Sequence, residues 1–150
     1  MREAFRMAKE GVKSGFGGPF GAVVVKNNNI ISRGCNMVLA TNDPTAHAEI
    51  VAIREACKVL NSFQLENCEI YTSCEPCPMC LGAIYWARPA VIYYSGNRFD
   101  AAAAGFDDSF IYDELLVAAT ERKIPLIPFL NQEAKQLFEI WNSSPLKKQY

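Results

Sequence analysis

The chain has 150 residues, of which 50% are hydrophobic and 21% are charged, as expected for one ordinary globular domain. Its 15 basic and 16 acidic residues leave a net charge of −1, which disfavours a protein that binds nucleic acid by neutralising many phosphates. No apolar run approaches the roughly 18 residues that a membrane span needs. The N-terminal MREAFRMAKE lacks the apolar core of a secretory signal, so we expect a cytoplasmic protein.

The first third of the chain predicts a helix followed by a β-hairpin. Apolar residues at helical spacing predict the helix over Arg2–Lys13. The run AVVVK, the turn Asn27–Asn29 and the pair Ile30-Ile31 predict two strands joined by a tight turn. We expect residues 34–45 to form a loop.

The middle of the chain predicts two helices that alternate with two strands. Asp43 suits the N-cap of a helix and the proline after it suits the first helical position, so we expect a helix from there to Leu60. Residues 68–72 and 91–94 predict short strands. Between these strands we expect a helix over residues 77–87, because a proline follows soon after.

The last third predicts a loop over residues 96–108 and a helix over 109–122 that Ser109 caps. A strand is expected over residues 124–129, where two prolines suit a sheet edge, and a final helix over 132–141. Because strands alternate with helices, we expect one α/β domain over residues 1–150. Its architecture would be a three-layer α/β/α fold, in which a mixed five-stranded sheet carries helices on both faces.

Six cysteines are present, and three of them crowd into seven positions, which indicates metal or redox chemistry rather than a disulfide framework. We interpret the three isolated ones as small buried apolar residues. The six are Cys35, Cys57, Cys68, Cys74, Cys77 and Cys80.

Cys77 and Cys80 are spaced to share the first turn of a helix, where two sulfurs reach one ion and the helix N-terminus favours thiolates. Zinc suits such a soft site, and His47, the only histidine, would be its third ligand. A lone histidine near an apolar helix is more often structural, but this one follows a predicted helix start and precedes Glu49 by two positions. Three protein ligands leave one position open, as catalytic zinc sites do.

Two questions about this cluster stay open from the sequence. Residues two apart do not share a helix face, so His47 and Glu49 converge only if the ion lies beyond the helix end. Cys74 also forms a CxxC pair with Cys77, and as a fourth ligand it would make the site structural. We expect Cys74 to lie at a strand end and to point elsewhere.

The order H-x-E followed by P-C-x-x-C resembles the signature of zinc-dependent nucleobase deaminases. The chain is similar to the cytidine deaminase superfamily over nearly its whole length. Within that superfamily it resembles the bacterial-type guanine deaminases, through GGPFGAVVVK, NDPTAHAEIVAIR, YTSCEPCPMCLGAIYWAR and AGFDDSFIY. The last of these blocks is the most discriminating.

The resemblance implies that each chain holds one Zn²⁺ and hydrolyses guanine to xanthine and ammonia. It makes Glu49 the residue that takes a proton from water, passes it to the ring nitrogen next to the attacked carbon and then helps the amine leave as ammonia. Without the cysteine motif, Glu49 would be interpreted as a solvated carboxylate in a first helical turn.

The resemblance also assigns residues to the substrate. Asn36 would bind the purine edge, and Phe20 and Trp86 would hold the flat base, for which stacking contributes about 1–3 kcal/mol. Asp108 would act as a second acidic catalytic residue. Each has a plain alternative: turn chemistry for Asn36, core packing for the aromatic residues and helix capping for Asp108.

The resemblance further implies a homodimer in which the segment over about residues 131–150 is swapped between chains. The terminal Tyr150 would then cover the base in the partner's pocket and exclude water. A disordered tail is the plain alternative.

Other functions remain alternatives. The nearest are deamination of guanosine or another aminopurine, and of adenosine in transfer RNA, which would need a basic rim that the near-neutral charge disfavours. A structural-zinc binding module or a CxxC redox protein is the alternative outside enzymes of this class.

Overall fold

The hairpin expected around Asn27–Asn29 forms the first part of the sheet. In the computed structural model, which describes residues 1–149, β1 (Gly21–Lys26) pairs antiparallel with β2 (Asn29–Cys35). Asn27 and Asn28 both have positive φ, as a two-residue type I′ turn requires and as asparagine tolerates. The turn therefore sets the register of the two pairs next to it, and a shift between Val24 and Val25 changes the register farther along the hairpin.

Two further strands complete the sheet in the order β2-β1-β3-β4. β3 (Cys68–Cys74) pairs antiparallel with β1, and β4 (Val91–Gly96) pairs parallel with β3. A parallel pair needs a crossover, which α4 (Pro78–Ala87) supplies. The carboxyl ends of β3 and β4 meet at one sheet edge, where Cys74 pairs with Gly96, so the loops after these strands start side by side.

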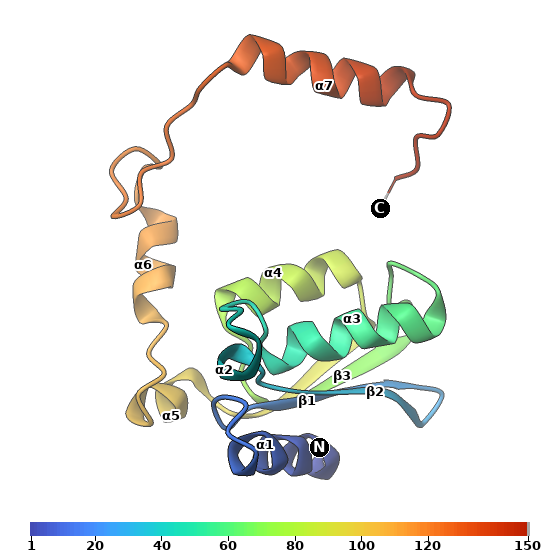
Figure 1. Ribbon diagram of the computed structural model, residues 1–150, viewed down its shortest axis with the longest axis vertical. Helices are drawn as coiled ribbons and strands as arrows, with labels where there is room; N and C mark the ends of the chain where they lie inside the picture. The colour runs from blue at the N-terminus through green and yellow to red at the C-terminus, as the bar shows by residue number, and fades with distance from the viewer. Residues whose placement is uncertain (150) are drawn as a thin grey trace. The chain divides into compact units, whose positions relative to one another are not determined.

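Helices cover both faces of this sheet, as expected (Figure 1). α1 (Arg2–Lys13) packs on one face, and α3 (Ala48–Leu60) and α4 lie on the other. The main core lies between the sheet and α3 and α4. Its buried members are Ala22, Val24, Ala48, Ala52, Ala56, Leu65, Cys68, Ile70, Ile84 and Ala87.

A close approach between β2 and α3 fixes the start of α3 over the sheet. A Cβ atom on Gly34 would lie 2.3 Å from the Ala48 carbonyl oxygen and 2.7 Å from the Ala52 nitrogen. Only glycine therefore fits at this point of β2. Because α3 carries small residues on the same side, the helix sits directly on the strand, and this contact positions the residues just before and inside its first turn.

The prediction of five strands is wrong, because the described residues form one sheet of four. Residues 124–129 adopt no regular structure and pair with no strand within residues 1–149. Pro125 and Pro128 remove two of the backbone N–H donors that a ladder would need. This segment is apolar, as a strand would be, but it does not add a strand to the sheet of its own chain.

Several predicted boundaries also move. The loop expected over residues 34–45 holds the end of β2 and the short α2 (Val38–Thr41), and the loop over 96–108 holds α5 (Arg98–Ala103). Helices of four and six residues are too short to show a 3.6-residue period. The helix expected over 109–122 ends early, as α6 (Ser109–Leu116).

The chain divides into two compact units, Met1–Asp108 and Ser109–Tyr150, where the sequence predicts one domain. The second unit contains α6 and α7 (Asn131–Ser143), and none of its described residues is buried. No helix within residues 1–149 has both the length and the apolar character that crossing a bilayer requires.

Candidate metal centre and substrate cavity

His47 lies at the N-cap of α3, in an extended conformation with φ −68° and ψ 157°. The helix start predicted at Asp43 is therefore too early. Asp43 instead closes a turn, in which its Oδ1 accepts the Thr45 N–H at 2.8 Å. Since His47 precedes the helix and Glu49 lies inside its first turn, the two side chains converge although they are two positions apart.

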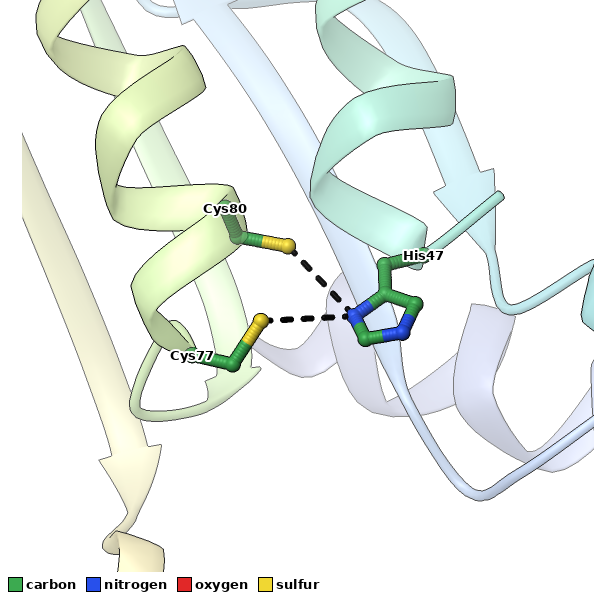
Figure 2. A group of neighbouring side chains, drawn as sticks. All are labelled: His47, Cys77 and Cys80. Atoms are coloured by element: carbon green, nitrogen blue, oxygen red, sulfur yellow. Dashed lines mark hydrogen bonds between the residues drawn. The ribbon is translucent and has the colours of Figure 1, made fainter. Parts of the chain in front are cut away.

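Cys77 occupies the corresponding place on α4. It is the N-cap, with φ −64° and ψ 167°, and Pro78 follows at the first helical position. Cys80 is buried in the first turn of the same helix. Both sulfur atoms lie 3.5 Å from His47 Nδ1, so residues from two helix starts meet at one point (Figure 2).

The three side chains fit a zinc ion. Their ligand atoms all lie within 4.8 Å of one another. Tetrahedral zinc with Zn–S of about 2.3 Å and Zn–N of about 2.0–2.1 Å would separate a sulfur from the nitrogen by roughly 3.5 Å. Both sulfur-to-nitrogen separations of 3.5 Å match this geometry.

The surroundings favour a charged pair of Cys77 and His47. A hydrogen bond from the Cys80 thiol, together with His47, lowers the pKa of Cys77 to about 4. A hydrogen bond with Cys77 raises the pKa of His47. The hydrogen bond between Cys80 and Cys77 raises the pKa of Cys80. Both cysteines also lie at the N-terminus of α4, whose partial positive charge stabilises a thiolate.

Glu49 is buried beside the cluster and is not one of its three members. Its Oε1 accepts a hydrogen bond of 2.8 Å from Thr72 Oγ1, and its Oε2 lies 3.5 Å from Cys80 Sγ. Burial raises the pKa of Glu49. Thr72 was not singled out from the sequence, although it is the polar member of the buried alternate positions of β3.

Cys74 is not part of the cluster within residues 1–149. Its thiol lies at the end of β3 and donates to the Asn97 carbonyl oxygen at 3.6 Å. Burial raises the pKa of Cys74 to about 11. The described cluster therefore offers three ligands and not four.

A cavity of about 510 Å³ in the first unit opens onto the cluster. This volume lies within the range of small-molecule sites. His47, Glu49 and Cys77 form part of its wall, and the predicted residues Phe20, Asn36 and Asp108 line it as well. Residues far apart in the sequence thus meet around one space.

Asn36 is buried and its Oδ1 accepts the Val38 N–H at 3.1 Å, which is the turn role that its plain alternative predicts. That bond leaves the amide NH₂ for the cavity that Asn36 lines. A Cβ atom on Gly17 would lie 2.0 Å from Asn36 Oδ1, so glycine is required there. The turn contact and the tight packing fix the orientation of this amide.

The aromatic wall differs from the predicted one. Phe20 meets Phe106 in an edge-to-face contact, with ring centroids 4.9 Å apart. Trp86 lies near the end of α4, is 64% exposed and does not line this cavity. Sequence reasoning missed Phe106, although it stands in the quoted block AGFDDSFIY two positions before Asp108.

Asp108 is half-buried in the cavity wall. Burial, with the nearby charge of Cys77, raises the pKa of Asp108. Glu75 and Arg98 also line the cavity and were not predicted from the sequence. Tyr150 lies outside the described residues.

Comparison with known proteins gives three findings that agree with this geometry. The sequence pattern described as the cytidine and deoxycytidylate deaminase zinc-binding region matches residues 1–95. The guanine deaminase of Bacillus subtilis (strain 168) is 55% identical over 150 residues, which is 100% of this chain and 96% of the relative. The X-ray structure of guanine deaminase from Bacillus subtilis superposes with a TM-score of 0.96 at 56% identity, over 99% of this chain and 95% of the other.

A tRNA-specific adenosine deaminase of Aquifex aeolicus (strain VF5) is 44% identical over 95 residues. This match covers 63% of the chain and 62% of that relative. The similarity to the tRNA enzyme is therefore shorter than the similarity to the guanine deaminase.

Proposed function

The chain belongs to the cytidine and deoxycytidylate deaminase family, and we propose that it is a zinc-dependent guanine deaminase. The reaction is the hydrolysis of guanine to xanthine and ammonia. The observation that carries this proposal is the cluster His47, Cys77 and Cys80, which offers three ligands beside the buried Glu49 at the wall of a cavity.

The extent of the similarity supports guanine over a transfer RNA substrate. The match to the guanine deaminase runs through all 150 residues and includes the second unit. The match to the tRNA enzyme covers 95 residues, so it leaves over a third of the chain unmatched. The net charge of −1 also offers little attraction to a polyphosphate backbone.

His47, Cys77 and Cys80 would hold one Zn²⁺ per chain. When bound with an open fourth position, zinc lowers the pKa of a coordinated water to about 7 and so supplies a nucleophile at neutral pH. The three side chains orient the centre, and the two thiolates balance its double positive charge.

Glu49 would move the protons of the reaction. A carboxyl group with a raised pKa both accepts and donates a proton near neutral pH. Thr72 holds one carboxylate oxygen, which leaves Oε2 as the atom facing the cluster. Glu49 would take one proton from water and give it to the ring nitrogen beside the amine-bearing carbon. It would then help the second proton, that of the hydroxyl added to this carbon, to reach the amine, so that the carbonyl forms as ammonia leaves.

The cavity wall would recognise the purine. The amide of Asn36 would bind its polar edge, and the rings of Phe20 and Phe106 would contact the base. Asp108 would accept N–H groups of guanine and relay a proton to the leaving amine. Its place before α6 also suits a capping role, which Asp108→Asn would separate from proton relay, because an amide still accepts a hydrogen bond.

A homodimer with exchanged C-terminal segments would complete the site. Leu137, Phe138 and Ile140 on α7 are each about two-thirds exposed. β4 ends the sheet with one unpaired edge among the described residues, and the irregular segment 124–129 lacks a partner strand there. Two chains would bury these surfaces against each other, and Tyr150 would reach the partner's cavity. A cytoplasmic location also stays a prediction of the sequence.

The test is a panel of ammonia-release assays with guanine, guanosine, adenine, cytosine and a tRNA anticodon stem-loop. We expect guanine to give the highest kcat/KM, with zinc present at roughly one ion per chain. Activity on the stem-loop alone would assign the chain to RNA editing. Zinc without activity on any substrate would favour a structural-zinc module.

A further inference from the structure

The loop that carries Cys77 is joined to the start of α5 through Glu75. The Glu75 backbone N–H donates to the Gly96 carbonyl oxygen at 2.7 Å, and its carboxylate Oε2 accepts the Arg98 backbone N–H at 3.0 Å. These two bonds lie where β3 and β4 end side by side. One residue thus connects the segments that follow both strands.

The bond to Arg98 completes the cap of α5. The first N–H groups of a helix have no partner inside the helix. Asn97 Oδ1 accepts those of Phe99 and Asp100 at 2.9 and 3.0 Å, and Asp100 Oδ2 accepts that of Asn97 at 2.8 Å. Glu75 provides the acceptor for the remaining one, and it is a carboxylate at the positive end of the helix.

The position of α5 in turn sets one wall of the cavity. Ala101 lines the cavity, and its carbonyl oxygen accepts the Phe106 N–H at 2.9 Å, which places Phe106 and Asp108 on the same wall. Glu75 is also close along the chain to the cluster of His47, Cys77 and Cys80, which we call the metal cluster, because it lies two positions before Cys77. A shift at the Glu75–Arg98 bond would therefore move Phe106 and Asp108, the cavity wall, relative to the metal cluster.

We propose that Glu75 is a positioning residue, which aligns the Phe106–Asp108 wall with the metal cluster by holding the start of α5. The kinetic part of this proposal rests on the proposed function. Glu75 also lines the cavity, so direct contact between its charge and the substrate is the competing explanation.

The experiment compares Glu75→Ala and Glu75→Gln with the wild-type holoenzyme. Glutamine keeps an oxygen that can accept the Arg98 N–H, whereas alanine removes the acceptor. We expect Glu75→Ala to lower kcat/KM for guanine by roughly tenfold, mainly through KM, because one hydrogen bond is lost and a wall is misplaced. We expect Glu75→Gln to stay close to the wild-type value, and zinc content to be unchanged in both.

A second readout does not depend on activity. Hydrogen exchange measured by mass spectrometry should become faster over residues 97–108 in Glu75→Ala and remain near the wild-type rate in Glu75→Gln. Glu55→Ala is the matched control, because it removes an exposed carboxylate of α3 that pairs with Lys58. It should change neither the exchange over 97–108 nor KM.

Three results would overturn the proposal. If Glu75→Gln is as slow as Glu75→Ala, the charge acts on the substrate directly. If the kinetics of Glu75→Ala match the wild type, the bond does not align the site. Unchanged exchange over residues 97–108 in Glu75→Ala would show that α5 does not depend on it. If the wild type is inactive on guanine while the exchange behaves as expected, the proposed function fails and the positioning role remains.

Discussion

The two units of the chain differ in how they use their apolar residues. Residues 1–108 bury a continuous core, in which Ala22, Val24 and Ile70 are fully inaccessible, and they hold the metal cluster and the cavity. Residues 109–149 contain no buried residue, although Leu116, Phe129 and Phe138 are exposed by 88%, 83% and 68%.

This difference separates a unit that stabilises itself from one that does not. Helices as short as the eight-residue α6 and the 13-residue α7 are marginal in water unless an apolar face is packed. The second unit has such faces without packing them internally. Chemistry would thus reside in the first unit, and the second would contribute through the dimer that we propose.

The largest expected effect comes from removing a metal ligand in the first unit. His47→Ala should abolish zinc binding and reduce guanine deamination to background, because two sulfurs alone do not hold a catalytic zinc. Metal analysis and ammonia release measure both outcomes. Cys74→Ser is the control, since its sulfur lies outside the cluster, and it should keep the zinc. Zinc lost from the control instead would make Cys74 a ligand.

The second-largest effect is expected at Glu49, the residue that we propose transfers protons. Glu49→Gln should lower kcat by about 10²–10⁴-fold while zinc is retained, because the amide still fills the buried space but cannot transfer a proton. Steady-state kinetics with metal analysis on the same sample measure this. A fully active variant with its zinc in place would contradict the assigned role.

The third prediction addresses the second unit. Phe138→Glu should weaken dimerisation by more than about thirtyfold, since it places a charge on the apolar face of α7. Analytical ultracentrifugation would show the shift to monomer, and KM should rise with it. Gln136→Glu changes a polar exposed residue of the same helix and should leave the dimer intact. An unchanged dimer in Phe138→Glu would remove the support for the swap.

A smaller effect is expected at Gly17. Gly17→Ala should lower the free energy of unfolding by about 1–3 kcal/mol and raise KM, because the new methyl group overlaps the Asn36 amide oxygen. Chemical denaturation and kinetics measure the two changes. Gly82→Ala offers a contrast, since a Cβ there meets nothing within 4 Å and alanine favours a helix. If Gly17→Ala and Gly82→Ala change the free energy of unfolding and KM equally, the overlap with Asn36 has no specific effect.

The smallest effect is expected at the surface of the first unit. Hydrogen bonds from Arg6 and Arg33 lower the pKa of Glu3 to about 2, below its usual value of 4.5. Its contribution to stability is therefore present above pH 4.5 and is lost as the pH falls toward 2. Glu3→Gln should lower the melting temperature slightly at pH 7 and by less at pH 2. If the melting curves of Glu3→Gln and the wild type coincide at pH 7 as well as at pH 2, the exposed ion pairs of Glu3 contribute nothing to stability.

The parts of the fold that follow from local signals were predictable. The hairpin is specified by Asn27 and Asn28, which accept positive φ, and α1 by its apolar period. The three candidate ligands follow from residue type and spacing, since His47, Cys77 and Cys80 each suit the start of a helix. The structure brings them together at the distances that zinc requires.

The rest depends on contacts that no local pattern reports. The start of α3 was misplaced because Asp43 caps a turn with the same chemistry by which it would cap a helix. Residues 124–129 have the composition of a strand but no partner strand among residues 1–149. Phe106 and Trp86 could not be ranked, because which aromatic ring lines the cavity depends on the path of α5.

The meeting of the β3 and β4 carboxyl ends at one edge has an evolutionary consequence. In the site that we propose, the connection after β3 carries Cys77 and Cys80, while the connection after β4 carries Phe106 and Asp108. Loops tolerate change better than the strands that carry them. In the proposed site, substitutions and insertions in the second connection would therefore change which amino heterocycle is accepted without disturbing Cys77 and Cys80. This modularity makes residues 97–108 the first place to mutate when the enzyme is engineered toward new substrates.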